Sequence, residues 1–539
     1  MEHPYLAAAR ERVVVFDGAT GTNLQLCDLG PDDFGGPALE GCNEVLVRTR
    51  PDVIRQLHAS FLEVGVDCIE TNSFGSSSVV LVEYGLAAEA FELNAEAARL
   101  ARELADSYAT ADRPRWVAGS MGPTTKLATL GHISYRELRD SFAEQASGLL
   151  HGGVDLLVIE TQQDLLTLKA AMNGCRRAMA AAGRQVPLQI QVTIETNGRM
   201  LIGSEIGAAL VAIDAMRADV IGLNCATGPR EMTEHLRHLQ ANSRVPISCL
   251  PNAGLPSIVD GRTHYDLTPE ELAEHHARFV TELGVSVVGG CCGTTPEHLR
   301  AVVERCGPLE PRARDPRPEP AATSIYSPVP YDQDVSVLLI GERTNTNGSR
   351  AFRDALLEQR WDDVVRVGTD QVKESAHLVD VCVDYVGRDG AVDMAEVAHR
   401  FATAVPLPLV LDSTEPPVLE AGLERLGGKC LLNSANLEDG EHPGSRFDRV
   451  MSLAREHGAG VICLTIDEEG QARTRERKLA IARRIRDLAG ERYGIAPEDL
   501  FFDCLALTLG TGLEESFGDG VETIEAIRLV KAELPGAHT

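Results

Sequence analysis

The sequence predicts an α/β protein made of two tandem (β/α)8 barrels of the TIM type, the second of them incomplete. Two observations predict this fold. Short apolar runs rich in valine, isoleucine and leucine alternate with amphipathic helical segments, and the pattern restarts after a proline-rich interruption. Parallel strands that alternate with helices are typical of α/β folds, and eight such units in about 300 residues are the arithmetic of a (β/α)8 barrel.

The first domain is predicted to span residues 1–307. Its expected strands are Val13–Phe16, Cys68–Asn72, Trp116–Ser120, Leu156–Glu160, Leu188–Ile194, Val220–Asn224, Ile247–Pro251 and Val285–Gly289. A doubly wound open sheet is the alternative, but it would need a glycine-rich dinucleotide turn after the first strand. The segment Asp17-Gly-Ala-Thr-Gly-Thr22 is a poor match to that turn, which favours the barrel.

Residues 308–334 are expected to form a linker, because they contain seven prolines and so exclude a helix or a central strand. The second domain is expected over residues 335–539. Its strands are predicted at Val335–Gly341, Leu378–Val383, Leu407–Asp412, Cys430–Asn433, Gly460–Asp467 and Leu500–Cys504. A closed barrel needs eight strands, so these six predict a second barrel that is incomplete at its C-terminal end.

The composition excludes several classes of protein. A hydrophobic content of 44% in 539 residues is globular, and no apolar run is long enough to span a membrane. The net charge of -29 argues against nucleic acid and anionic membranes as partners. Thirteen scattered cysteines do not resemble a secreted disulfide framework, so we expect a cytoplasmic protein.

Three cysteines are predicted to lie at the same end of the first barrel. Cys225 ends the sixth expected strand, and Cys291 and Cys292 follow the eighth. Three thiolates with one open position are the ligand set of a reactive zinc site, and such a metal holds an incoming thiol as its thiolate at neutral pH. The sequence therefore predicts alkyl transfer to a thiol, although three small core cysteines remain the alternative interpretation.

The first 307 residues resemble the homocysteine S-methyltransferase domain. The matching segments are Asp17-Gly-Ala-Thr-Gly-Thr22, Glu70-Thr-Asn-Ser-Phe74, Gly119-Ser-Met-Gly-Pro123, Glu160-Thr161, Gly222-Leu-Asn-Cys225, Pro251-Asn-Ala-Gly254 and Gly289-Gly-Cys-Cys-Gly293. The resemblance implies that Cys225, Cys291 and Cys292 bind zinc and act in catalysis. It also implies that homocysteine is held by Asp17, Gly18, Ala19, Glu160 and Asn224. Asn252 is a weak candidate for a fourth zinc ligand, with an ordinary turn residue as the alternative.

In the second half a polar residue stands at the tip of each expected strand. These residues are Glu342, Asn345, Asp380, Asp412, Asn433, Ser434, Asp467 and Asp503. Carboxylates and amides around one rim suit a polar heterocycle such as a pterin, whose N–H edge donates two hydrogen bonds to a carboxylate. Each one taken alone is also explained as a helix cap or a turn residue.

The second half resembles the pterin-binding methyltransferases, which are related in fold to dihydropteroate synthase. The two domains in tandem resemble the N-terminal half of the cobalamin-dependent methionine synthase family. This implies that homocysteine receives a methyl group from 5-methyltetrahydrofolate, relayed by methylcobalamin on a module absent from this chain. Cys382 stands where relatives carry an asparagine, and the chain has no Asp-x-His-x-x-Gly cobalamin motif. The alternatives are a betaine- or S-methylmethionine-type homocysteine methyltransferase and a non-catalytic pterin-binding fragment.

Overall fold

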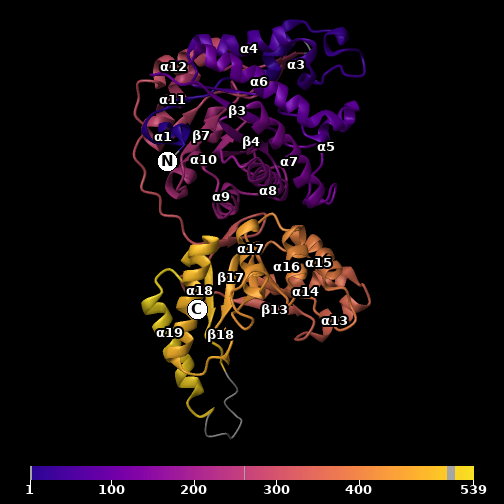
Figure 1. Cartoon of the computed structure of the whole chain (residues 1–539), viewed down its shortest axis with the longest axis vertical. Helices are drawn as coiled ribbons and strands as arrows, with labels where there is room; N and C mark the ends of the chain where they lie inside the picture. Colours follow the sequence, from indigo (N-terminus) through magenta and orange to yellow (C-terminus); the bar gives the residue numbers. More distant parts are fainter. Residues whose placement is uncertain (1–2, 260–261, 507–515) are drawn as a thin grey trace. The chain divides into compact units, whose positions relative to one another are not determined.

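The computed structural model describes residues 3–259, 262–506 and 516–539, which form two compact units (Figure 1). The first unit spans Met1–Pro318 and the second spans Glu319–Thr539. Each unit has its own sheet and its own hydrophobic core.

The first unit is built around an eight-stranded parallel sheet, as the sequence predicts. Its strands are β1 (Val14–Val15), β2 (Cys68–Glu70), β3 (Trp116–Met121), β4 (Leu156–Gln162), β5 (Leu188–Val192), β6 (Val220–Asn224), β7 (Ile247–Leu250) and β10 (Val287–Val288). They pair in the order β1-β10-β7-β6-β5-β4-β3-β2. A parallel bridge between Phe16 and Cys68 joins the two ends of this sheet, so the strands surround a common interior.

Helices pack around this sheet, most of them on its outside (Figure 1). They are α1 (Pro4–Glu11), α2 (Thr20–Leu24), α3 (Leu46–Thr49), α4 (Pro51–Val64), α5 (Ser78–Leu81), α6 (Ala90–Tyr108), α7 (Tyr135–Gly152), α8 (Leu165–Ala182), α9 (Ile206–Ala215), α10 (Pro229–Asn242), α11 (Pro269–Leu283) and α12 (Pro296–Cys306). The start and the stop of α11 show how the sequence sets such a helix. Thr268 and Glu271 form a capping box, Pro269 occupies the first turn, and Gly284 ends the helix with a left-handed φ of 68°.

The interior of the first sheet is filled from its amino-terminal end by α1. Tyr5 is fully buried and packs edge-on against Phe16 and Trp116. Its hydroxyl donates to the buried side chain of Gln189 in β5. This plug leaves the carboxyl ends of the strands as the open end, which is where α/β barrels place their functional residues.

The second unit contains six parallel strands, the number that the sequence predicts. They are β13 (Ile340–Asn345), β14 (Leu378–Cys382), β15 (Leu409–Asp412), β16 (Leu431–Ala435), β17 (Gly460–Leu464) and β20 (Leu500–Asp503), paired in that order. Within the described residues β13 and β20 do not pair with each other, so the sheet is open and a second barrel is not formed. His538 makes a parallel bridge to Phe501 on the outer side of β20.

The helices of the second unit are α13 (Arg350–Leu357), α14 (Trp361–Lys373), α15 (Gly390–Ala404), α16 (Pro416–Leu423), α17 (Arg446–His457), α18 (Arg475–Leu488) and α19 (Asp519–Glu533). One strand prediction is displaced in this unit. The run from Val335 to Gly341 was expected as a strand, but β13 begins at Ile340 and Val335 is 98% exposed. Apolar β-branched residues therefore do not mark a strand here, because no neighbour covers them.

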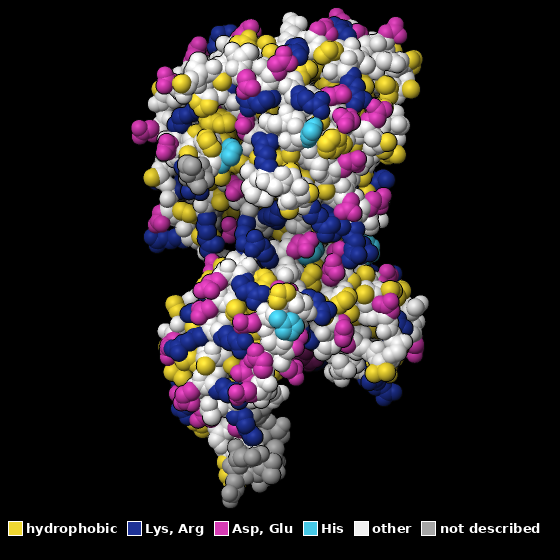
Figure 2. All heavy atoms as spheres, viewed as in Figure 1, with side chains coloured by type: hydrophobic (Ala, Val, Ile, Leu, Met, Phe, Trp, Pro, Cys, Tyr) yellow, Lys and Arg dark blue, Asp and Glu magenta, His cyan; other side chains and the backbone are white. Residues whose placement is uncertain are grey.

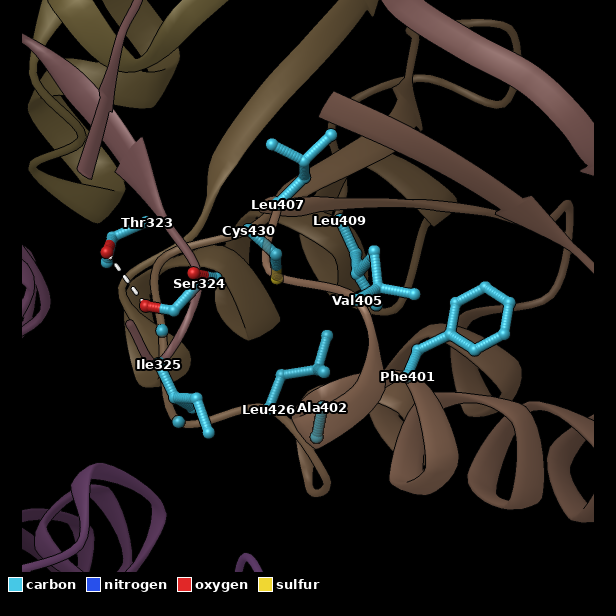
Figure 3. A pocket seen from close by; sticks show the side chains of 12 residues that line it. Thr323, Ser324, Ile325, Phe401, Ala402, Val405, Leu407, Leu409, Leu426 and Cys430 are labelled. Carbon is cyan, nitrogen blue, oxygen red and sulfur yellow. Dashed lines mark hydrogen bonds between the residues drawn. The ribbon is translucent and has the colours of Figure 1, made fainter. Parts of the chain in front are cut away.

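Part of the proline-rich segment is ordered by the second unit. Two antiparallel strands, β11 (Ala321–Thr323) and β12 (Pro328–Pro330), form a hairpin that the linker prediction did not include. Ala322 and Tyr331 are buried with Leu378, Val410 and Leu431 of the sheet. Figure 3 shows the small cavity beside this hairpin, about 20 Å³ in volume, which Leu407, Leu409, Val405, Leu426 and Phe401 line.

The earlier part of the same segment is held by the first unit. Backbone N–H groups of Arg312 and Arg317 donate to the carbonyls of Val280 and Ala241, at 3.0 and 2.9 Å. The guanidinium of Arg314 donates to the carbonyls of Ser243 and Val245, at 2.8 and 2.6 Å. Extended, proline-rich backbone has no internal hydrogen bonds, so these contacts with the barrel hold it in place.

Charged side chains of both signs are interspersed on the face shown in Figure 2, although the whole chain carries a net charge of -29. None of the helices in the described part of the chain combines the length and the apolar character that a bilayer crossing requires.

Candidate functional site

Three sulfur atoms meet at the carboxyl end of the first sheet. The ligand atoms of Cys225, Cys291 and Cys292 all lie within 4.8 Å of one another, and all three residues are partly exposed. The Sγ atoms of Cys225 and Cys292 are 3.9 Å apart. These are the three cysteines that the spacing of strands predicts to converge, although 67 residues separate Cys225 from Cys292. Sulfurs that are this close suit a shared soft metal ion.

The backbone at Cys225 has an uncommon conformation. Cys225 and Ala226 have φ values of 59° and 56°, in the left-handed region that non-glycine residues rarely adopt. The Cys225 N–H donates to the carbonyl of Leu250 in the neighbouring strand at 3.3 Å, and the Thr227 N–H donates to the Cys225 carbonyl at 2.6 Å. Strain of this kind is typical of functional sites, and here it accompanies the placement of Cys225 in the cluster.

The turn before Cys291 depends on two glycines. A Cβ atom on Gly290 would lie 2.3 Å from Oγ1 of Thr294, and one on Gly289 would lie 2.6 Å from Cδ2 of Leu250. The space that a side chain would need is therefore filled by neighbours. His276 of α11 is fully buried, and its Nε2 lies 2.8 Å from the Gly289 carbonyl oxygen. This contact holds the end of the strand that leads to the two cysteines.

The chemistry of the cluster fits a zinc ion. The thiols of Cys225 and Cys292 are within hydrogen-bonding distance of each other. Contacts with Cys225 and then Cys291 lower the pKa of Cys292, whereas contacts with Cys225 and then Cys292 raise the pKa of Cys291. A divalent cation among the three sulfurs would favour the thiolate form of each. Asn252 is 3% exposed, and its side-chain oxygen is buried without a hydrogen-bond partner in the described structure. An unpaired amide oxygen near such a cluster is a candidate for the weak fourth ligand.

Three carboxylates lie at the same end of the sheet as the sulfurs. Asp17 after β1 and Glu160 in β4 are buried, and Glu70 at the end of β2 is partly buried. Burial raises the pKa of Glu160 to about 7, and burial together with the neighbouring carboxylates raises those of Asp17 and Glu70. Oδ1 of Asp17 and Oε1 of Glu70 are buried and have no partner in the described structure. A cation such as an ammonium group would satisfy them.

The predicted substrate residues differ in how they are held. Glu160 accepts hydrogen bonds from Ser120 Oγ at 2.6 Å and from Asn224 Nδ2 at 2.9 Å. The Ala19 N–H already donates to Thr294 Oγ1 at 3.1 Å, and a Cβ on the adjacent Gly18 would meet the same oxygen at 2.6 Å. Sequence reasoning missed Glu70 as a site residue, although its place at a strand tip was a usable signal.

In the second unit, three of the predicted tip residues form one hydrogen-bonded group. Asn345 Nδ2 lies 3.3 Å from Oδ2 of Asp380 and 3.4 Å from Oδ2 of Asp412. Burial, and then the charge of Asp412, raises the pKa of Asp380 to about 7. Cys382, which stands in place of an amide, pairs in register with Asp412 of the neighbouring strand. The group offers carboxylate acceptors to a ligand with N–H donors.

The remaining tip residues are held in other ways. Oδ1 of Asp467 is paired with Arg477, and Oδ1 of Asp503 accepts the N–H of Leu505 at 2.7 Å. Asn433 pairs in register with Asp412, Ser434 follows it in β16, and Glu342 is exposed.

Two residues at this rim were not predicted. Asp384 accepts from Ser413 Oγ at 2.8 Å, and Arg446 donates to the carbonyls of Ser413, Thr414 and Ser434.

Comparisons with known proteins give a family match for each of the two units. The homocysteine S-methyltransferase family model matches residues 14–306, and the pterin binding enzyme model matches residues 341–538. Methionine synthase of Mycobacterium tuberculosis is 52% identical over 530 residues, covering 98% of this chain and 44% of that protein. Methionine synthase of Mycobacterium leprae is 50% identical over 547 residues, covering 100% of this chain and 45% of that protein. The chain thus spans less than half of the curated relatives it matches. The homocysteine methyltransferase MmuM of Escherichia coli, in its metallated form, is 22% identical with a TM-score of 0.45, covering 54% of this chain and 96% of MmuM.

An eight-stranded parallel barrel with a thiol cluster and buried acids at its open end defines an α/β-barrel protein with a candidate active site at the carboxyl ends of its strands. Within that class, the chain belongs to the homocysteine S-methyltransferase family, whose model covers more than half of it.

Proposed function

We propose that this chain methylates homocysteine and forms part of a methionine synthase that works in the cytoplasm, with Cys225, Cys291 and Cys292 holding a zinc ion. The observation that supports it most strongly is the convergence of three sulfurs within 4.8 Å beside buried acids. A zinc ion held by three thiolates would keep the homocysteine sulfur as a nucleophilic thiolate at neutral pH. All 13 cysteines are free, as a reducing compartment requires.

The residues of the chain would orient the amino acid. Glu160, Asp17 and Glu70 present carboxylate oxygens to its ammonium group, and the unpartnered oxygens of Asp17 and Glu70 gain a donor when it binds. Asn224 holds Glu160 in place, because its amide group bonds both Glu160 and Thr161. This fixes the amino end of the substrate, so that its sulfur reaches the cysteine cluster.

The methyl group would originate on 5-methyltetrahydrofolate and would be relayed by a cobalamin carried on a module outside this chain. In the second unit, Asn345, Asp380 and Asp412 would recognise the pterin, with Asn433, Ser434 and Glu342 at the same rim. Support comes from the match of residues 341–538 to the pterin binding enzymes and from the identity with methionine synthases.

We also propose that the second unit is built as a barrel of which these six strands are the larger part. His538 already pairs with Phe501 beside β20, in the direction that the strand order follows. A cavity of about 580 Å³ lies against the two unpaired edges and is lined by Ile340 of β13, Phe501 of β20 and Ile527 of α19. Apolar lining at an open edge suits further strands.

Zinc content and methyl transfer test the proposal together. The purified chain should hold about one zinc ion and form methionine from homocysteine and free methylcobalamin. Cys225→Ala should lose most of the zinc and the activity, because it removes one of three anionic ligands. Cys27→Ala is the matched control, since Cys27 is exposed and lies outside the cluster. Full zinc occupancy in Cys225→Ala, or equal loss in Cys27→Ala, would contradict the assignment.

A further inference from the structure

A chain of hydrogen bonds links the carboxyl ends of neighbouring strands in the second unit. Thr346, which follows β13, donates its hydroxyl to the carbonyl of Asp384, two residues after β14, at 2.7 Å. The Asp384 carboxylate in turn accepts from Ser413 Oγ at 2.8 Å and from the Thr414 N–H at 3.1 Å, directly after β15. The ends of β13, β14 and β15 are therefore tied side by side.

Arg446, the first residue of α17, extends this chain of bonds to β16. Its Nη1 donates to the Thr414 carbonyl at 2.7 Å, and its Nη2 donates to the carbonyls of Ser413 and Ser434, each at 3.2 Å. Its Nε lies 3.3 Å from the Ser434 carbonyl oxygen. A guanidinium group suits this place, because its N–H groups point in fixed directions within one plane. Together these residues form a rim network, made of Thr346, Asp384, Ser413, Thr414, Ser434 and Arg446.

The rim network is continuous with the predicted pterin residues. Each of Asn345, Asp412 and Asn433 is directly followed in the sequence by a member of the network. The three lie in one row across the sheet, since Asn345 and Asp412 both pair in register with Cys382, and Asp412 also pairs with Asn433. Within the described residues β13 and β20 do not pair, so barrel closure does not fix these strand ends. The network holds the backbone that carries the row.

Building on the proposed pterin site, we propose that Arg446 is a positioning residue for pterin binding. It acts through the backbone of Ser413 and Ser434, and it holds the ends of β15 and β16 so that Asp412 and Asn433 face the ligand together. Side chains that are already held in place lose less conformational freedom when a ligand binds, so the complex is tighter. A lysine at this position would not replace the arginine fully, because one ammonium group is a point charge without the planar fork.

Titration of the full chain with 5-methyltetrahydrofolate, followed by fluorescence, tests this inference. Arg446→Ala should bind about tenfold more weakly than the wild type, and Arg446→Lys should lie between the two. Methylguanidinium, added below denaturing concentrations, should restore most of the affinity of Arg446→Ala and leave the wild type unchanged. Arg449→Ala is the matched control, because Arg449 lies on the same helix and its Nε donates to the Gly444 carbonyl at 3.0 Å, outside the network. The homocysteine affinity of the first unit should be equal in all four proteins.

The other outcomes separate this inference from the proposed function. Equal pterin affinity in Arg446→Ala and the wild type would overturn the positioning role and leave the pterin site itself standing. A loss of binding that neither Arg446→Lys nor methylguanidinium restores would also overturn it, because damage to the fold of the second unit gives that result. An equal loss in Arg449→Ala would do the same. A wild type that does not bind 5-methyltetrahydrofolate would overturn the proposed pterin site and this inference together.

Discussion

The side-chain amide of Asn224, at the end of β6, donates a hydrogen bond to Oε2 of Glu160 in β4 across 2.9 Å. The amide oxygen of the same residue accepts the N–H of Thr161 at 2.8 Å. Asn224 is fully buried and directly precedes Cys225. One residue therefore couples the position of a predicted metal ligand to that of a predicted substrate carboxylate.

Replacing Asn224 with alanine should weaken homocysteine binding more than zinc binding. Glu160 would keep only the donor from Ser120, and its buried carboxylate would hold a proton more tightly. We expect homocysteine affinity to fall about tenfold, because hydrogen bonds to charged groups contribute about 1.5–3 kcal/mol. Isothermal titration calorimetry of the zinc-loaded protein measures this effect.

The control for this variant is Asn242→Ala. Asn242 ends α10, and its amide donates to the His238 carbonyl at 2.9 Å, in a part of the barrel that has no predicted substrate residue. Its affinity for homocysteine should equal that of the wild type. Unchanged affinity in Asn224→Ala would remove Glu160 from the substrate site, whereas a parallel loss of zinc would show that Asn224 acts mainly through Cys225.

The barrel and its sulfur cluster could be predicted because each depends on a regular pattern. Fully buried parallel strands such as β4 and β6 appear in the sequence as short apolar runs. Because every strand runs in the same direction, residues that follow the runs meet at one end. Cys225 and Cys292 are thus brought together by topology, with no short-range motif.

Contacts that depend on irregular backbone could not be predicted. Tyr265 lies in a connection between β7 and α11, where no periodic pattern indicates which side chain packs against Gly293. Asp467 lies in a small hairpin formed by β18 (Ile466–Asp467) and β19 (Gly470–Gln471). There its carboxylate forms an ion pair with Arg477. The ladder between β11 and β12 likewise forms at a proline-rich segment whose composition indicates a linker.

Changing Asp380 to asparagine should weaken the binding of a pterin by the second unit. A carboxylate accepts two N–H bonds from the pterin edge, whereas an amide offers one acceptor and places a donor against that edge. We expect the wild-type chain to bind methyltetrahydrofolate weakly, because the sheet is open, and Asp380→Asn to bind at least about tenfold more weakly. Fluorescence titration gives both affinities.

Asp362→Asn is the matched control, since Asp362 is an exposed residue in the first turn of α14. Its pterin affinity should equal that of the wild type. Equal binding by Asp380→Asn would show that the group around Asn345 is not the pterin site. Tight binding by the wild type would contradict our expectation that the open sheet impairs the site.

Gly222 in β6 should be intolerant of even one methyl group. A Cβ atom there would lie 2.0 Å from Oγ and 2.3 Å from the carbonyl oxygen of Ser248 in β7. Because the second contact is with backbone, a rotamer change cannot relieve it, and Gly222→Ala should lower the free energy of unfolding by about 2 kcal/mol or more. Gly21→Ala is the control, since nothing lies within 4 Å of a Cβ at that position. Chemical denaturation compares the two, and equal stability would mean that β6 and β7 are farther apart than described.

Two buried histidines should make the first unit less stable in mild acid. His58 in α4 and His276 in α11 are at most 1% exposed, and burial lowers the pKa of each to about 4. In the unfolded chain, both histidines gain a proton as the pH falls through about 6.5. In the folded protein, both stay neutral until the pH approaches 4. The unfolded state then binds more protons, so stability is constant above about pH 7 and falls as the pH drops from 6.5 toward 4.

Between pH 7.5 and 5.0, each of these histidines should cost about 2 kcal/mol of unfolding free energy. Denaturation of the wild type and of His58→Gln at both pH values isolates this contribution, because the carboxylates titrate equally in the two proteins. His58→Gln should lose about 2 kcal/mol less than the wild type over this range, whatever its stability at pH 7.5. His132→Gln should follow the wild type, since His132 is exposed on the same unit. If His58→Gln shows the full wild-type loss, then His58 is hydrated or already charged in the folded state, and acid sensitivity must come from His276 or from the buried carboxylates.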